Sequence, residues 1–208
     1  PAGYPDMESF KAEAARRIAK AGTIDPTAPA PHATAGARRA APRFYECVKE
    51  KRAKAAAGCG GGPCDIVWVG DSLSEDMTGY KCYWDRTLPG VGGSWSKSSL
   101  RNRTMLVAGS MDETQHTLYT LREVLPALQR PLLFFVLIGT NNIGSSLMRP
   151  PQTTRGVKAV VDAIRAAFPG VKVLLHTQLP RYDEPEPAHR GTLQMRLDVL
   201  DTLLSGYA

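Results

Sequence analysis

The sequence predicts one α/β domain built on a doubly wound parallel sheet, with helices on both faces in three layers. Short apolar runs alternate along the chain with longer stretches in which apolar residues recur every three or four positions. The first pattern is typical of buried strands and the second of amphipathic helices. Strands that alternate with helices form a parallel sheet with right-handed crossovers. The runs predict strands around residues 65–69, 104–108, 132–138 and 171–176.

Helices are expected between these strands, each marked by an apolar stripe at helical spacing. One begins at Pro150 and Pro151, and another follows Asp112, which is expected to cap it with Gln115 in the capping-box position. Further helices are expected through Cys47 and Lys54, just after Ser72, and through Leu193, Leu197, Leu200 and Leu204.

The composition changes near residue 43, where we predict a domain boundary. Residues 7–20 form a short amphipathic stretch with Met7, Phe10 and Ile18 on one face, and residues 21–42 are rich in Ala, Pro and Gly. Such a composition cannot bury a core. We therefore expect residues 1–42 to be an N-terminal helix and a linker that packs across the domain, contacts a partner or stays mobile, and residues 43–208 to be the compact domain.

Composition and charge exclude several classes of protein. Hydrophobic residues make up 43% of the chain, enough for a core, and no run approaches the roughly 18 apolar residues of a membrane span. Most of the formal net charge of +6 lies in the first 58 residues. A basic N-terminal arm can bind an acidic partner or remain solvated. We expect no nucleic-acid binding and no membrane span.

Four cysteines lie near the first strand: Cys47, Cys59, Cys64 and Cys82. Their even number predicts at least one disulfide, most simply in the turn between Cys59 and Cys64, and their spacing lacks the close pairs of zinc sites. Asn102 begins a glycosylation sequon. Cysteines and sequon together favour a secreted or lumenal protein, with an organelle or the cytoplasm as alternatives. Because the chain opens on Pro1, we expect a removed targeting segment or a longer native chain.

Polar residues follow two of the apolar runs directly. The first run leads into Gly70-Asp71-Ser72-Leu73, and the run that ends at Ile138 leads into Gly139-Thr140-Asn141-Asn142. In a parallel α/β sheet both groups lie at the carboxyl edge, where ligands bind. A serine hydroxyl beside an asparagine amide is a nucleophile beside an oxyanion donor. The alternatives are purely structural roles, in which Ser72 and Glu75 form a capping box and Asn141 caps a turn.

These two motifs resemble the SGNH hydrolases, also called GDSL-type esterases and lipases, in the branch containing the platelet-activating-factor acetylhydrolase catalytic subunits. The resemblance implies a flavodoxin-like fold, Ser72 as nucleophile and Asn141 as oxyanion donor. A third donor, a backbone N–H after the second strand, falls on Gly109 or, by a strict overlay of the following residues, on Ala108. It further implies hydrolysis of a small carboxylic ester through an acyl-serine, with no metal or organic cofactor.

The chain departs from the family pattern at its C-terminal end. The family's base is a histidine in an Asp-x-x-His element after a fifth strand, and none of the four histidines, His32, His116, His176 and His189, has that context. We therefore expect residues 43–208 to be C-terminally incomplete, the fifth strand to be missing, and the chain alone to hydrolyse esters slowly. The alternative is a catalytically inactive SGNH scaffold, with a protein partner on the exposed sheet edge or the basic arm.

Overall fold

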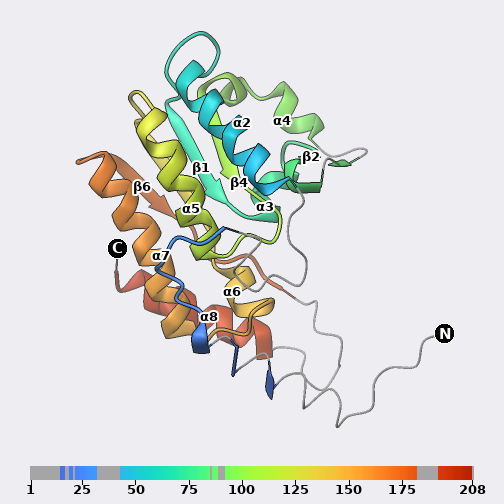
Figure 1. The fold of residues 1–208 in the computed structure, drawn as a ribbon, viewed down its shortest axis with the longest axis vertical. Helices are drawn as coiled ribbons and strands as arrows, with labels where there is room; N and C mark the ends of the chain where they lie inside the picture. Colours follow the sequence, from blue (N-terminus) through green and yellow to red (C-terminus); the bar gives the residue numbers. More distant parts are fainter. Residues whose placement is uncertain are drawn as a thin grey trace, which may run out of the picture.

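The computed structural model describes residues 15, 16, 19, 20, 22–31, 43–84, 86–88, 92–181 and 192–207, and confirms the α/β architecture. The main sheet has four strands in the order β4-β1-β5-β6, all parallel (Figure 1). These strands are β1 (Ile66–Gly70), β4 (Thr104–Ala108), β5 (Leu133–Leu137) and β6 (Lys172–Leu175). All four predicted strands are present, and in the described chain β6 is an edge strand of the sheet, as expected, with β4 at the other edge.

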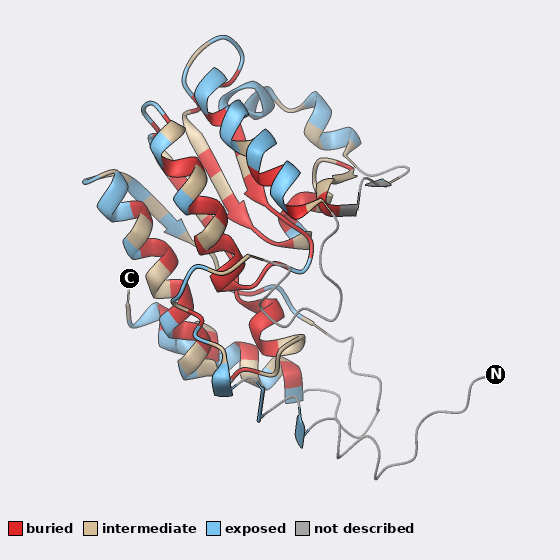
Figure 2. Cartoon of the chain, viewed as in Figure 1, coloured by how far each residue is buried: buried red, intermediate tan, exposed pale blue. Residues whose placement is uncertain are grey.

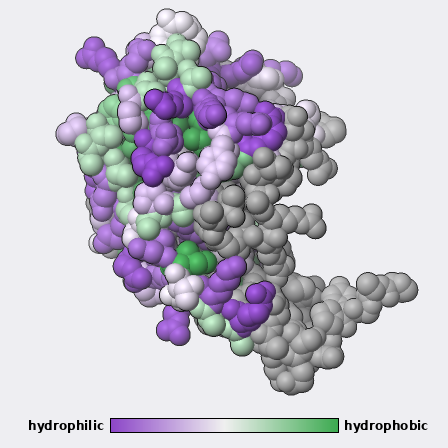
Figure 3. All heavy atoms as spheres, in the orientation of Figure 1, coloured by the Kyte–Doolittle hydropathy of each residue, from purple (hydrophilic) through white to green (hydrophobic). Residues whose placement is uncertain are grey.

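Helices α2 (Phe44–Ala57), α5 (Thr114–Val124) and α7 (Pro150–Ala167) lie over one face of the sheet (Figure 1). Their inward residues form one core with the alternate strand residues Val67, Val69, Phe134 and Val136. In Figure 3, the coloured part of the outer surface of these helices carries hydrophilic side chains with small hydrophobic areas between them. Burial of the strand residues against the helices is the main source of stability.

The opposite face of the sheet carries Trp68, Phe135 and Leu174 in register on adjacent strands. The Trp68 and Phe135 ring centroids are 4.0 Å apart, and the Trp68 Nε1–H donates to Ser74 Oγ in α3 (Ser72–Asp76) at 3.1 Å. Cover decreases toward the outer strand, where Leu174 is 51% exposed. Within the described part of the chain, helix α3 therefore covers this face of the sheet mainly near β1 and β4.

The C-terminal helix α8 (Thr192–Ser205) packs on α7 and on the short helix α6 (Thr140–Gly144). Its predicted stripe is confirmed, because Leu193, Leu197, Leu200 and Leu204 are all buried. The smaller elements are β2 (Tyr80–Lys81), η1 (Cys82–Trp84), β3 (Arg86–Thr87), α4 (Gly93–Lys97), η2 (Ser99–Arg103) and η3 (Leu125–Ala127). No helix in the described chain combines the length and the apolar character of a membrane span.

Residues 22–31 cross the outside of α5 and α7 (Figure 2). Pro26 is buried, and its carbonyl accepts from the Thr114 hydroxyl at 3.0 Å. The Ala30 N–H donates to the Gln115 carbonyl, and Gln152 Nε2 donates to the Ile24 carbonyl. This part of the expected linker is therefore held by the domain. Met7, Phe10 and Ile18 lie outside the described residues, and the boundary at residue 43 stays a prediction.

Two disulfides confirm the expectation from the cysteine count. Cys59 and Cys64 close the glycine-rich turn before β1, as predicted, and Cys47 of α2 is joined to Cys82 of η1. The second bridge connects segments 35 residues apart. It fixes one side of α2 to the loop that follows α3.

The predicted cap of α5 is wrong by one residue. Glu113, not Asp112, is the N-cap, and it forms a capping box with His116 rather than Gln115. The Asp112 side chain instead accepts from the Tyr83 hydroxyl at 3.0 Å. The residue that the local sequence predicts as a cap is thus engaged in a tertiary hydrogen bond instead.

Gly156 lies inside α7 where the N-terminal segment crosses it. A Cβ there would sit 2.2 Å from Thr114 Oγ1 and 2.9 Å from Pro26 Cβ. We expect Gly156→Ala to destabilise the fold by about 1–3 kcal/mol, because overpacking outweighs the better helix propensity of alanine. Urea unfolding measures this effect. Gly93→Ala, which meets open space, is the control, and an unchanged midpoint for Gly156→Ala would contradict the packing described for residues 22–31.

Candidate active site

The three predicted site residues follow the ends of three adjacent strands. Gly70 of β1 is in register with Ala108 of β4 and with Leu137 of β5. Ser72, Gly109 and Asn141 come one to four residues after these positions. Because the strands are parallel, all three emerge at the carboxyl edge of the sheet.

Ser72 begins helix α3 and does not cap it. The N-cap is Asp71, whose Oδ1 accepts from the Leu73 N–H at 3.0 Å. The capping-box alternative for Ser72 and Glu75 is therefore wrong. Ser72 is half-buried, and within the described residues its hydroxyl has no hydrogen-bond partner. This leaves the hydroxyl available for chemistry.

Glu75 has a different task from the one its spacing predicts. It is 2% exposed, and its carboxylate accepts from the Cys82 N–H at 3.0 Å. It also accepts from the Ser110 N–H at 2.8 Å and the Ser110 hydroxyl at 2.6 Å. One carboxylate on the serine helix thus holds both η1 and the loop after β4.

The loop after β4 is shaped by a close contact with Tyr83. A Cβ on Gly109 would lie 2.2 Å from Tyr83 Cζ, so only glycine fits against the ring. The φ of Gly109 is not in the left-handed region, whereas Met111 has φ 68°. Ala108 ends β4 and is buried. Since the Ser110 N–H is taken by Glu75, the amides of Gly109 and Ala108 are the loop donors to consider.

Asn141 lies inside α6 and does not cap it, because the N-cap is Gly139, with φ 124°. Its side chain is 4% exposed, and Nδ2 donates to the Asp112 carbonyl at 2.9 Å. An amide nitrogen carries two protons. The contact with Asp112 uses one of them, and the other can meet a developing negative charge.

The two described histidines are occupied elsewhere. His116 is fully buried in the first turn of α5, where Nδ1 accepts from the Glu113 N–H at 3.0 Å. The His176 ring lies 5.3 Å from the Phe135 ring, and its Nδ1 is 2.5 Å from the Thr177 carbonyl oxygen. No hydrogen bond joins either ring to Ser72. His32 and His189 lie outside the described residues.

Four ionisable groups are buried behind the strand ends: Lys51, Asp71, Glu75 and Asp112. Burial raises the pKa of Asp71 from 3.8 to about 6 and raises that of Asp112 well above its usual range. Burial lowers the pKa of Lys51, while Asp112 and Glu75 act in the opposite direction. Sequence reasoning missed Lys51, Glu75 and Asp112 as parts of the site, because local pattern assigned them to helix surfaces and caps.

Two aromatic residues, Tyr83 and Trp95, lie in the segments between α3 and β4. Tyr83 is fully buried and packs on Phe44, with ring centroids 5.4 Å apart. Trp95 lies half-buried on α4. A surface pocket lined by Lys49, Arg52 and Pro126 is near the end of α2 that leads toward β1. That end belongs to the amino edge of the sheet, opposite Ser72.

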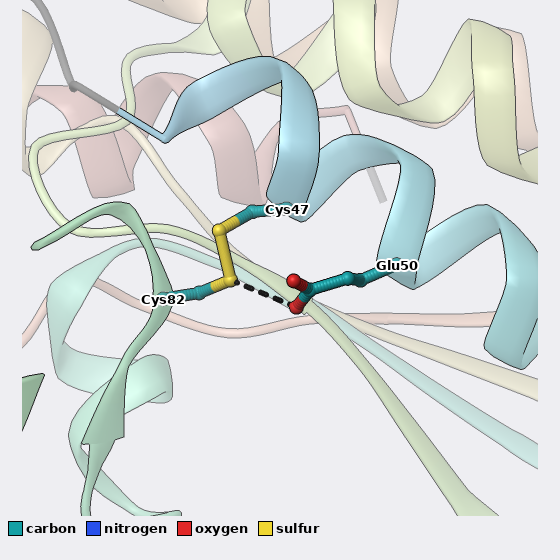
Figure 4. Close-up of side chains that lie close together, drawn as sticks. All are labelled: Cys47, Glu50 and Cys82. Atoms are coloured by element: carbon teal, nitrogen blue, oxygen red, sulfur yellow. Dashed lines mark hydrogen bonds between the residues drawn. A yellow bond between two sulfur atoms is a disulfide. The ribbon is translucent and has the colours of Figure 1, made fainter. Parts of the chain in front are cut away.

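In the described chain, the side chains that come close enough to share a metal ion are Cys47, Glu50 and Cys82 (Figure 4). The two sulfurs form a disulfide, and Glu50 Oε2 lies 3.4 Å from Cys82 Sγ. Metal binding by cysteine requires thiolates. These residues therefore do not fit a metal while the bridge is intact.

Comparison with known proteins decides the family. Residues 68–208 match the model of the GDSL-like Lipase/Acylhydrolase family. The chain belongs to this family. The match begins within β1, at residue 68, and covers Ser72 and every described element that follows.

Several relatives carry the same kind of name. Platelet-activating factor acetylhydrolase IB subunit alpha1 of Homo sapiens is 29% identical over 143 residues, which are 69% of this chain and 55% of the relative. The Bos taurus protein of that name is 32% identical over 123 residues, 59% of this chain and 47% of the relative. The chain thus spans about half the length of the curated relatives it matches.

A solved structure supports the fold. A Bacteroides fragilis protein described as a candidate acylhydrolase superposes with a TM-score of 0.52 at 21% identity, over 69% of this chain and 62% of that one. The SGNH membership expected from the motifs is confirmed, and the family is one of ester hydrolases.

The buried Asp71 predicts a specific pH dependence. Between about pH 4 and 6 the unfolded carboxyl ionises before the folded one, so this group destabilises the fold as pH rises and has a constant effect above its folded pKa of about 6. Asp71→Asn keeps an acceptor for the Leu73 N–H and removes the buried charge. Its stability relative to wild type should rise by about 2–3 kcal/mol from pH 4 to pH 7.

Denaturant unfolding at several pH values tests this expectation. Asp198→Asn, at an exposed position on α8, is the control and should change the pH dependence of stability less than Asp71→Asn does. If stability against pH ran parallel for Asp71→Asn and wild type, the result would contradict the burial of an ionised Asp71 carboxylate.

Proposed function

We propose that the protein hydrolyses carboxylic esters through Ser72. The observation that carries the proposal is the Ser72 hydroxyl itself. It is half-buried, unengaged by other described residues, and located at the sheet edge to which Gly109 and Asn141 also belong. A serine that only stabilised the fold would be expected to use its hydroxyl as a cap, and Asp71 has that task.

The proposed reaction proceeds in two acyl-transfer steps. Ser72 Oγ attacks the ester carbonyl, its proton passes to a base, and the negative charge develops on the former carbonyl oxygen. Asn141 Nδ2 and a main-chain N–H from Gly109, with Ala108 as the alternative, stabilise that charge. Collapse of the intermediate expels the alcohol and leaves an acyl-serine, which water hydrolyses.

A general base is the remaining requirement. Neither described histidine contacts Ser72, so we propose that the base is a group other than these two histidines. We expect slow turnover by this chain unless a base reaches Ser72, since loss of the base in a serine hydrolase costs about six orders of magnitude. The same observation favours the second candidate, a non-catalytic SGNH scaffold that binds a partner.

The relatives and the disulfides support a proposed substrate class and location. Relatives named acetylhydrolases make a short acetyl ester the first substrate to test. Two disulfides are typical of an oxidising compartment. We propose a secreted or lumenal enzyme that acts on small acyl esters without metal or organic cofactor.

Covalent labelling tests the nucleophile. A fluorophosphonate reacts once with a nucleophilic serine and needs no turnover, so after a long incubation mass spectrometry should find the adduct on the peptide containing Ser72. Ser72→Ala should abolish labelling, whereas Ser94→Ala, an exposed serine on α4, should leave it unchanged. Absence of an adduct on wild-type protein would favour the scaffold candidate.

The oxyanion role of Asn141 has its own expected result. Asn141→Ala should lower the rate of acetyl-ester cleavage or of phosphonylation by about 10² to 10³. A thermal melt distinguishes this from unfolding, because the lost contact with the Asp112 carbonyl is one hydrogen bond. Equal rates in the folded variant and wild type would exclude Asn141 as a donor.

A further inference from the structure

We propose that Tyr83 and Lys51 are positioning residues for the oxyanion loop, residues 108–112. Lys51 belongs to α2, which precedes the region matched by the family model. The inference rests on the proposed function and extends it to a helix that the family match does not include. Neither residue is placed where it would touch a substrate.

Tyr83 fixes the loop at two points. Its ring packs so closely on Gly109 that a Cβ would be 2.2 Å from Cζ, and its hydroxyl donates to Asp112 Oδ2 at 3.0 Å. The side chain is fully buried. The ring therefore limits how far the Gly109 backbone can retract, and the hydroxyl fixes the far end of the loop.

Asp112 connects Tyr83 to the second proposed donor. Its side chain accepts from Tyr83, and its main-chain carbonyl accepts from Asn141 Nδ2 at 2.9 Å. A shift of Asp112 would therefore move or release the Asn141 amide. Through Asp112, one tyrosine hydroxyl sets the positions of both the loop amide and the side-chain amide.

Lys51 places its amino group over the Tyr83 ring. Its Nζ is buried, lies 5.0 Å from the centroid of the Tyr83 ring, and has no hydrogen-bond partner in the described chain. Asp112 Oδ1 is likewise buried without a partner there. Lys51 attracts Asp112 and Glu75 electrostatically, and this attraction lowers the pKa of Asp112 against the larger, opposite effect of burial.

The disulfide joins the two positioning residues into one unit. Cys82 precedes Tyr83 directly and is bonded to Cys47, one helical turn before Lys51 on α2 (Figure 4). The Arg43 N–H at the start of α2 also donates to the Tyr83 carbonyl at 3.3 Å. Helix α2 and η1 are thus held together covalently on the side that faces the loop.

The test compares Tyr83→Phe and Lys51→Met with two controls on α2, Tyr45→Phe and Lys49→Met, at exposed positions. Tyr83→Phe keeps the ring and removes only the hydroxyl. We expect it to slow fluorophosphonate labelling of Ser72, or kcat for an acetyl ester, about tenfold with KM unchanged. Lys51→Met should have the same effect, and the controls should match wild type.

A second measurement does not depend on activity. In ¹H–¹⁵N spectra of the full chain, Tyr83→Phe should shift the Asn141 side-chain amide and the Gly109 amide and speed their hydrogen exchange at least tenfold. A purely structural role for the tyrosine hydroxyl would lower the melting temperature without this local effect.

The outcomes separate the two proposals. If wild-type protein fails to react at Ser72, the proposed function fails, and the spectra alone decide the positioning role. Unchanged Asn141 and Gly109 signals in Tyr83→Phe would overturn that role, as would a wild-type labelling rate in this variant. Should Lys51→Met not fold, Tyr83→Phe still decides.

Discussion

A single buried carboxylate, that of Glu75, fastens the serine helix to the loops around it. It accepts hydrogen bonds from η1 through Cys82 and from the oxyanion loop through Ser110, while its own helix carries Ser72. Buried carboxylates are unfavourable unless their oxygens are fully hydrogen-bonded. Three donors satisfy Glu75, and the same three bonds determine how η1 and the loop lie against α3.

Together with Glu75, the site buries two further carboxyl groups, and buried carboxyl groups are unfavourable in a protein core. Asp71, Glu75 and Asp112 are all nearly or fully buried, and the buried Nζ of Lys51 interacts electrostatically with Asp112 and Glu75. An arrangement of this kind lowers stability in exchange for fixed dipoles at the sheet edge. The Cys47–Cys82 disulfide joins α2, which carries Lys51, to η1, which carries Tyr83.

Sequence patterns predicted the strands, the long helices and the outer position of β6, because these depend on apolar periodicity within one segment. They missed α6 and the β2–β3 ribbon, which are too short to show a period. Asp112 was predicted as a cap because local chemistry favours it, and the structure uses it for Tyr83, 29 residues away. The cysteine count predicted a disulfide, but pairing Cys47 with Cys82 needed the packing of α2 against η1.

The motifs at Ser72 and Asn141 were readable because each follows a strand directly, whereas the residues that hold them came from other parts of the chain. Lys51 is surrounded in sequence by charged and small residues typical of a solvated helix face. Only the fold turns its Nζ inward. This difference is general for sites in α/β proteins, in which reacting groups are placed by strand ends and their support comes from tertiary contacts.

The most direct test of the account is a crystal structure of the protein after reaction with a fluorophosphonate. We predict phosphorus bonded to Ser72 Oγ and the phosphoryl oxygen within hydrogen-bond distance of Asn141 Nδ2 and of the main-chain N–H of Gly109 or Ala108. An adduct whose phosphoryl oxygen faces solvent, away from both donors, would contradict the assignment of the oxyanion site.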